Sequence, residues 1–221
     1  LDSIYVDFDY AIDNLPSKYG DNEFNFATKG AALAYKARIA LYMKDYSTAR
    51  DAAEECINLG NYELFPDYAT LFLNKTKNSV ESIFTVAYSE ELGVLNPMEP
   101  RSFLVRTVGG FGSVTPSWDL LCSYLCTDGL PIDESPLFNP REPFKNRDPR
   151  LAATIVPFDT EFLGVQYSCH PDTLEVYNYK TNSYISNTQN RAITQFATYN
   201  GISLKKYIDE SWLNYSEDND M

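Results

Sequence analysis

The sequence predicts a mostly α fold of the α+β kind, in which a helical-repeat part is followed by a loop-rich, irregular subdomain containing short strands. Apolar side chains recur with helical spacing up to Gly60, and the alanine-rich segments there have the composition of closely packed helices. Beyond that point prolines and glycines interrupt short apolar runs, most densely over residues 89–115. We therefore expect two parts, a helical one over residues 1–73 and an irregular one over residues 74–221.

Helices are expected first. Residues 1–14 place Ile4 and Ile12 on one face of a helix. Residues 26–43, FATKGAALAYKARIALYM, combine high helix propensity with small side chains that let a neighbouring helix approach closely. After a short turn, residues 46–60, YSTARDAAEECINLG, have the same character and end on a glycine, which is a common residue at helix C-termini.

The second and third of these helices resemble one tetratricopeptide repeat. Leu33 and Ala37 occupy characteristic positions of the first helix of such a repeat. Ala49 and Ala53 occupy characteristic positions of its second helix. A single repeat cannot bury its own faces, so the helix over residues 1–14 is expected as one packing partner. The helical part is therefore interpreted as tetratricopeptide-like helical repeats.

The middle of the chain is expected to be less regular. Pro66 and Asp67 predict the start of a short helix that ends at Phe72. Residues 82–88, SIFTVAY, alternate and are rich in β-formers, which predicts a strand. Residues 89–115 predict a long irregular stretch, and a loop of that length inside a compact domain is usually functional or disordered.

One further helix, a capped turn and several strands are expected in the rest. Thr115 and Pro116 precede SWDLLCSYLC, which has a helical pattern. Asp148 followed by Pro149 predicts a helix start, because Asp is a favoured N-cap and Pro suits the first helical position. The strand-like runs are AATIVPF, LEVYNYK and GISLKKYID.

Composition excludes several classes of protein. With 31 acidic and 18 basic residues the formal net charge is −13, which argues against binding of nucleic acid or of anionic membrane surfaces. No apolar run is long enough to cross a bilayer. One histidine and four cysteines without a CxxC pair make a poor zinc set, so we assign no metal-ligand residues and no cofactor. The sequence does not reveal whether its acid-rich loops hold calcium. The cysteines, expected to be buried thiols, are Cys56, Cys122, Cys126 and Cys169.

The sequence favours binding over catalysis. It contains no GxSxG elbow, HExxH motif or phosphate-binding loop. Cys169 and His170 are neighbours in sequence, which seldom supplies the geometry of a catalytic pair. Adjacent acids such as Asp133 and Glu134 are usually solvated surface. We therefore predict that the chain is not an enzyme.

Six stretches follow one another along the chain: ATKGAALAYKARIALYMKDYSTARDAA, GNYELFPDYATLF, ESIFTVAYS, VTPSWDLLCSYLCTDGLPI, PFKNRDPRLAATI and LKKYIDESW. In this order they resemble the SusD/RagB family of surface glycan-binding lipoproteins. Together they touch nearly the whole chain. The run NRDPRL after a DG-P loop is the most specific part, since helical repeats alone serve many functions.

The resemblance implies a non-catalytic protein on the extracellular face of the outer membrane. There it would cap a SusC-like TonB-dependent transporter, and the two would take up oligosaccharides or, in some members, peptides. The resemblance also implies that the repeat helices mainly face the transporter, whereas the irregular part carries the ligand site. Such proteins begin with a lipidated cysteine, so we expect membrane contact only through a lipid anchor outside the printed residues.

Aromatic residues of the irregular segments are the predicted ligand contacts. Sugars present flat C–H patches and a rim of hydroxyls, which proteins bind with exposed aromatic faces and polar side chains. Tyr177 and Tyr179 would share one face of a strand. Arg147, Asp148 and Arg150, by contrast, are interpreted as structural. The predicted ligand-binding residues are Phe103, Phe111, Trp118, Tyr167, Tyr177 and Tyr179.

Three alternatives stay open at this point. In the first alternative, the ligand is a peptide instead of a glycan. In the second, the chain is a repeat scaffold that only contacts a partner protein, as the repeat pair around Ala37 and Ala49 suggests. In the third alternative, the chain is a glycosidase. Glycoside hydrolysis requires two carboxylates at a defined separation, and the sequence does not reveal whether two of the chain's carboxylates have it. The sequence does not name the ligand.

Overall fold

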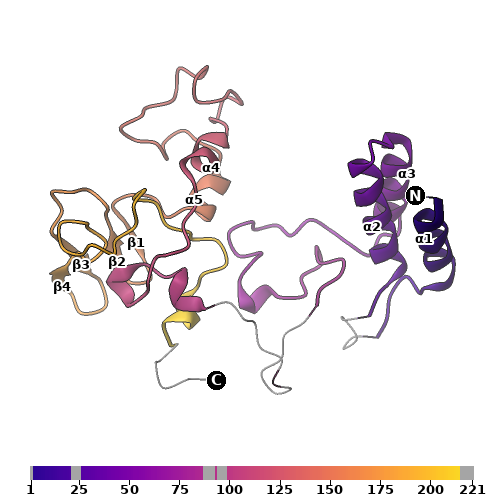
Figure 1. Cartoon of the computed structure of the whole chain (residues 1–221), viewed down its shortest axis with the longest axis horizontal. Coiled ribbons are helices and arrows are strands. Elements are labelled where there is room, and N and C mark those ends of the chain that lie inside the picture. The colour runs from indigo at the N-terminus through magenta and orange to yellow at the C-terminus, as the bar shows by residue number, and fades with distance from the viewer. Residues whose placement is uncertain (1, 21–25, 87–92, 94–98, 215–221) are drawn as a thin grey trace. The chain divides into compact units, whose positions relative to one another are not determined.

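The computed structural model describes residues 2–20, 26–86, 93 and 99–214 (Figure 1). Contacts divide the chain into two compact units. We call Leu1–Asp67 with Thr76–Asn96 the helical unit, and Tyr68–Lys75 with Pro97–Met221 the mixed unit. The expected boundary after residue 73 stays a prediction.

The helical unit is built on three helices. They are α1 (Asp2–Asn14), α2 (Lys29–Tyr42) and α3 (Tyr46–Asn58), and α2 packs against both of the others (Figure 1). Side chains cap two of these helices, because Thr28 accepts a hydrogen bond at the start of α2 and Asp45 does so at the start of α3. The three helices expected from the sequence are confirmed.

The core of the helical unit lies between these helices. Leu33 is its most deeply buried member, and the small side chains of α2 and α3 surround it. Alanines at such positions let two helices approach closely, which is what the alanine-rich pattern predicted. The buried members are Ile12, Ala32, Leu33, Ala52 and Cys56, with Ile83 packed against them.

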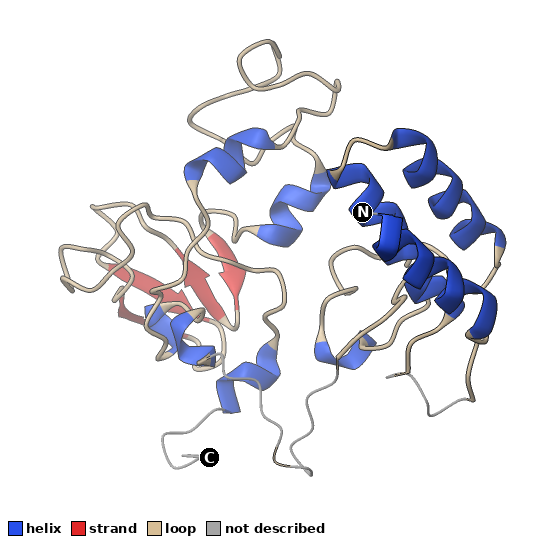
Figure 2. Cartoon of the chain, turned by 45° about the vertical axis from the view of Figure 1, so that its right-hand side comes forward, coloured by secondary structure: helices blue, strands red, loops and turns tan. Residues whose placement is uncertain are grey.

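The mixed unit contains two short α-helices and a small antiparallel sheet, which Figure 2 draws in red. The order of the strands in this sheet is β1-β2-β3-β4. The mostly α fold with short strands is thereby confirmed. The helices are α4 (Trp118–Ser123) and α5 (Pro149–Thr154), and the strands are β1 (Thr160–Phe162), β2 (Val165–Tyr167), β3 (Glu175–Asn178) and β4 (Ser183–Ser186). The 3₁₀ turns are η1 (Asn74–Thr76), η2 (Pro100–Ser102), η3 (Arg106–Val108) and η4 (Glu210–Asn214).

A two-residue turn joins β1 to β2. Leu163 and Gly164 have positive φ angles of 55° and 82°. Two-residue hairpin turns with positive φ at both central residues match the right-handed twist of the flanking strands. The turn sets Phe162 opposite Val165, and both side chains are buried. The sheet thereby adds its apolar face to the unit's core.

Two apolar clusters form that core, and both draw on distant parts of the sequence. Segments near residues 104, 156, 165 and 208 meet in the first cluster, and α4, α5 and residue 202 meet in the second. The buried members are Leu104, Val105, Val156, Phe162, Leu163, Tyr167 and Ile208 in the first, and Leu121, Leu151, Ile155 and Ile202 in the second.

The run NRDPR ties α4 to α5. Arg147 is only 5% exposed, and its guanidinium donates to the carbonyl oxygens of Leu121, Tyr124 and Pro143, each over 2.8 Å. Asp148 caps α5 by accepting from the backbone N–H of Arg150. The Arg150 side chain and this backbone bond also lower the pKa of Asp148. The predicted helix start at Asp148 is therefore confirmed.

Two expectations for the middle of the chain were wrong. Residues 68–72 form turns instead of a helix, and Phe72 packs edge-on against Tyr68 and Tyr207. Residues 82–86 form no strand, while 87 and 88 lie outside the described residues. An alternating pattern makes a strand only where a neighbouring strand accepts its hydrogen bonds; here Ile83 packs on the helical core instead.

The other strand expectations had mixed outcomes. LEVYNYK contains β3, as predicted. AATIVPF and GISLKKYID form no strands; an isolated bridge between Ile155 and Leu204 and neighbouring backbone hydrogen bonds, such as the one from the N–H of Val156 to the carbonyl oxygen of Ser203, join them. The reason is that α5, which begins at its cap Asp148 and at Pro149, includes the first half of AATIVPF.

In the described part of the chain, no helix combines the length and apolar character of a membrane span.

Candidate ligand-binding groove

An open groove of about 790 Å³ lies in the mixed unit, and this volume suits a small ligand. Its walls come from two irregular segments, residues 106–115 and 191–200. The lining residues are Arg106, Phe111, Gly112, Ser113, Thr115, Arg191, Gln195, Phe196, Ala197, Thr198, Tyr199 and Asn200.

Backbone hydrogen bonds fix the first wall. The N–H of Phe111 donates to the carbonyl of Arg101 over 2.6 Å, and the N–H of Gly112 donates to that of Leu104 over 2.9 Å. The chain therefore folds back on itself around η2 and η3, and Phe111 is set on the groove. This portion of the long irregular stretch is ordered by its own backbone.

Buried amide groups join the two walls. Gln189 is almost fully buried, and its Oε1 accepts from the backbone N–H of Arg106 over 3.0 Å. The Gln189 Nε2 donates to Thr198 Oγ1 over 2.9 Å. Both polar atoms of this amide are therefore satisfied, and they hold the segments at a fixed separation.

Three arginine side chains lie against aromatic rings at the groove. The guanidinium carbon is 4.4 Å from the ring centroid for Arg101 on Phe111. It is 5.3 Å for Arg106 on Phe196, and 3.9 Å for Arg191 on Tyr199. Such cation–π contacts orient the cation and the ring together.

The rings stay accessible despite these contacts. Tyr199 is 89% exposed, Phe196 is 62% exposed and Phe111 is 39% exposed. Aromatic faces this open are unusual outside binding surfaces when they gather at one place. Gln195 lies beside them with an exposed amide that can donate and accept.

Two of the predicted ligand-binding residues lie at the groove. Phe111 lines it. Trp118, at the start of α4, donates from Nε1 to the carbonyl oxygen of Asn200 over 3.0 Å, so it stands at the edge of the second wall.

Phe103 and Tyr167 lie in the core instead. Phe103 packs edge-on against Trp212, with ring centroids 6.1 Å apart. Tyr167 is 1% exposed and donates to the carbonyl of Gly201 over 2.9 Å. Burial raises the pKa of the Tyr167 phenol above its ordinary value. Neither ring offers an open face to a ligand in this conformation.

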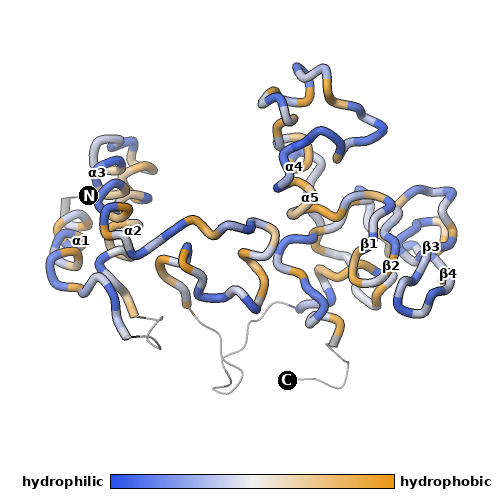
Figure 3. The backbone as a smooth tube through the Cα atoms, turned by 180° about the vertical axis from the view of Figure 1, so that it is seen from behind, coloured by the Kyte–Doolittle hydropathy of each residue, from blue (hydrophilic) through white to orange (hydrophobic). Residues whose placement is uncertain are grey.

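Tyr177 and Tyr179 form a separate aromatic cluster on the β3–β4 hairpin, which is largely hydrophilic (Figure 3). The Tyr177 ring centroid is 5.0 Å from that of Tyr179 and 5.3 Å from that of Tyr184. None of the three lines the groove. The role of Tyr177 and Tyr179 in ligand binding stays a prediction.

The sequence analysis missed the second wall of the groove. Phe196 and Tyr199 lie in a polar loop without periodicity, and nothing local distinguishes them from packing residues. The usable signal was compositional, because Arg191, Phe196 and Tyr199 fall within one short irregular run. The pairing of that run with residues 106–115 is a long-range contact that a single sequence does not reveal.

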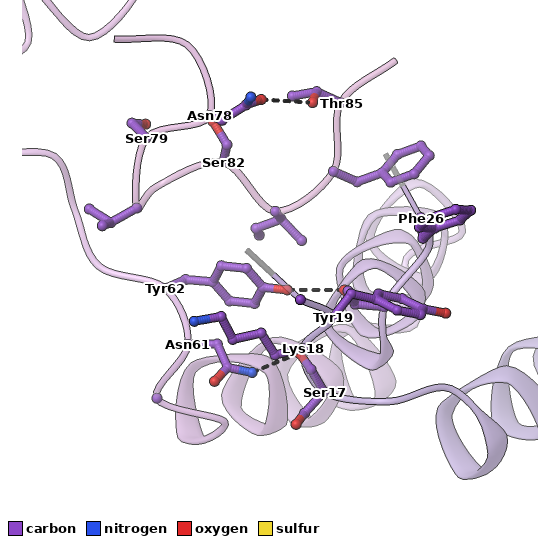
Figure 4. Close-up of a pocket in the computed structure, with 16 residues that line it drawn as sticks. Ser17, Lys18, Tyr19, Phe26, Asn61, Tyr62, Asn78, Ser79, Ser82 and Thr85 are labelled. Atoms are coloured by element: carbon purple, nitrogen blue, oxygen red, sulfur yellow. Dashed lines mark hydrogen bonds between the residues drawn. The ribbon is translucent and has the colours of Figure 1, made fainter. Parts of the chain in front are cut away.

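A smaller pocket of about 310 Å³ lies in the helical unit (Figure 4). Several of its polar groups bond one another, such as Tyr62 Oη with Thr28 Oγ1 at 3.1 Å and the Asn61 amide with the Ser17 carbonyl at 2.8 Å. We take the groove of the mixed unit as the candidate site, because it is the larger of the two and open aromatic rings gather around it.

The described residues give little support for metal chemistry. Within them, no three His, Cys, Asp or Glu side chains gather closely enough to hold a metal ion. The four cysteines are free thiols; Cys56 and Cys126 are buried, as expected, while Cys122 and Cys169 are half-buried. Burial raises the pKa of the Cys56 and Cys169 thiols, which makes them weak nucleophiles.

Comparison with known proteins gives consistent results. The model of the SusD family matches residues 80–221. A SusD-like carbohydrate-binding protein from Bacteroides fragilis is similar in structure, with a TM-score of 0.75 and 31% sequence identity over 95% of this chain and 40% of that one. A second SusD-like protein from the same organism gives 0.69 and 24% over 95% and 42%, and at this identity it shows the fold alone.

The chain spans less than half the length of these two solved relatives. No curated protein sequence matches it.

Proposed function

This chain belongs to the SusD family, and from that membership we propose that its groove binds an oligosaccharide without acting on it chemically. One observation carries the proposal: three accessible aromatic rings, Phe111, Phe196 and Tyr199, stand around a single open groove. The B. fragilis relative described as carbohydrate-binding supports the same choice of ligand.

The chemistry of the groove suits a sugar. The apolar faces of a pyranose pack on exposed aromatic rings, which bury area at little cost in conformational entropy. Hydroxyl groups need partners that both donate and accept, and the exposed Gln195 amide is one. The open walls leave room for a chain of sugars to continue beyond the groove.

The proposed setting is the extracellular face of the outer membrane. There the whole protein would hand its ligand to a SusC-like TonB-dependent transporter. The helical unit would supply part of the contact with that partner. Exposed apolar side chains on its helices support this role, since such side chains are typical of protein interfaces. They include Leu41, Tyr42, Tyr46 and Ile57.

Binding is tested by calorimetry of the full-length protein against a panel of neutral and charged oligosaccharides. We expect Tyr199→Ala and Phe196→Ala each to weaken binding about tenfold or more, as loss of a central aromatic contact does. Tyr42→Ala is the matched control, because Tyr42 is 82% exposed but lies on α2 in the other unit. It should leave the affinity unchanged.

Two other outcomes would change the proposal. If a folded protein binds no glycan but binds peptides at the same residues, the ligand class is wrong. If Tyr177→Ala weakens binding while Tyr199→Ala does not, the site is the hairpin cluster. Release of reducing ends that a Tyr199 variant abolishes would contradict the non-catalytic role.

A further inference from the structure

The charge of the groove is opposite to that of the chain. The chain carries a formal net charge of −13. The described residues that line the groove nevertheless include Arg106 and Arg191, and none of them is Asp, Glu or Lys. A concave, cationic site on an acidic surface concentrates anions locally.

Both guanidinium groups keep free donors. Arg106 Nε donates to the carbonyl oxygen of Phe196. Arg191 Nη1 donates to the carbonyl oxygen of Ala197 over 3.3 Å. No carboxylate among the described residues pairs with either, in contrast to Arg150, which pairs with Asp148. Since a guanidinium carries five N–H donors, each groove arginine can still donate to an incoming anion.

The arginines are also held in position. Phe196 and Tyr199 support the two guanidinium groups from one side. The backbone of Arg106 is fixed by Gln189, whose amide joins the two walls. A cation ordered before binding loses less conformational entropy when a ligand arrives.

From these three observations we infer that the groove takes an acidic oligosaccharide, whose sugar rings carry carboxylate or sulfate groups. The inference rests on the proposed function and narrows its ligand class. The aromatic rings take the sugar faces, and Arg106 and Arg191 take the anionic groups. A planar guanidinium can hold either group with two parallel hydrogen bonds.

The test compares ligands that have the same sugar backbone but different charge, by calorimetry on the full-length protein. One pair is an oligogalacturonate and its methyl ester. The other pair is a sulfated galactan oligosaccharide and its desulfated form, and comparison of the pairs distinguishes the carboxylate from the sulfate. We expect the charged member of at least one pair to bind about tenfold tighter or more than its neutral partner. Its affinity should fall as sodium chloride rises from about 0.05 M to about 0.5 M, since salt screens charge pairs.

Variants locate the effect. Arg191→Gln should weaken the acidic ligand about tenfold more than it weakens the neutral partner, and Arg191→Lys should restore part of that difference. Arg141→Gln removes the same charge from an exposed position outside the groove and is the control. Circular dichroism confirms that each variant is folded.

The outcomes separate the inference from the proposed function. If neutral and acidic members bind equally and Arg191→Gln changes neither, the groove binds neutral glycans and the inference fails alone. If acidic ligands bind but neither Arg191→Gln nor Arg106→Gln weakens them, the inference also fails. If no glycan of either kind binds, both are wrong.

Discussion

Two arginines of the NRDPR run, close in sequence, do different work. Arg147 is buried and donates to three backbone carbonyls from two separate segments. Arg150 is exposed and pairs with Asp148, two residues away. The sequence analysis interpreted both as structural, and the burial and contacts of Arg147 agree with that interpretation. It did not rank them, because two of the three partners of Arg147, the carbonyls of Leu121 and Tyr124, belong to α4 and its C-terminal end, more than 20 residues away.

Arg147→Met should destabilise the mixed unit by about 3 kcal/mol, because three buried carbonyls lose a charged donor. Arg150→Met should cost much less than Arg147→Met, since an exposed ion pair contributes little. Urea denaturation of the two folded variants measures both changes. Equal losses would mean that the carbonyls of α4 find other partners, and the anchoring role of Arg147 would be wrong.

At the scale of elements, the turn around Gly109 and Gly110 fixes the first wall of the groove. A Cβ at Gly110 would lie 2.1 Å from the carbonyl oxygen of Leu104 and 2.4 Å from its Cβ. Gly109 has φ of 88° but open space around it. Gly110 is therefore required by the close approach of the Leu104 backbone, whereas Gly109 is favoured by its left-handed backbone conformation.

Gly110→Ala should therefore displace the backbone, cost about 1–3 kcal/mol and weaken ligand binding, because Phe111 moves with it. Gly109→Ala should cost about 1–2 kcal/mol for its left-handed conformation and affect binding less. Denaturation and calorimetry on the same pair of variants measure the two effects. Normal binding by Gly110→Ala would show that Phe111 is not positioned by this turn.

The elements also show where sequence reasoning succeeds. Helices α1 to α3 and the start of α5 follow from periodicity and capping, which are local properties. The expected strand over residues 82–88 was wrong in its described part because pairing requires a neighbour from elsewhere in the chain. The groove shares that difficulty: Arg106 and Gln189 meet across 83 positions. Phe111 could be predicted because it is an aromatic residue within the long irregular stretch over residues 89–115, which is a local property of the sequence.

At the scale of the whole molecule, the helical unit and the mixed unit each have their own hydrophobic core, which determines how the chain is stabilised. Leu33 belongs to a cluster built only from the helical unit, and Ile155 belongs to one built only from the mixed unit. Each unit therefore has its own source of stability. Loss of core packing in one of them should be felt mainly inside that unit.

Leu33→Ala should cost about 2–5 kcal/mol, as removal of a buried leucine does, and loosen only the helical unit. Hydrogen exchange of the full-length protein should show faster exchange in α1, α2 and α3 and unchanged exchange in α5 and β2. Ile155→Ala should give the converse pattern. If either variant accelerates exchange throughout the chain, the two units unfold as one.

The hydrogen bond from Trp118 to Asn200 gives the protein an optical reporter. The chain has two tryptophans, and the other, Trp212, packs against Phe103 in the core. Indole fluorescence follows the polarity around the ring, and Trp118 is 43% exposed beside the second wall. A ligand settling on that wall would change the colour and intensity of emission from one residue. Occupancy of the groove can then be followed in real time without a label.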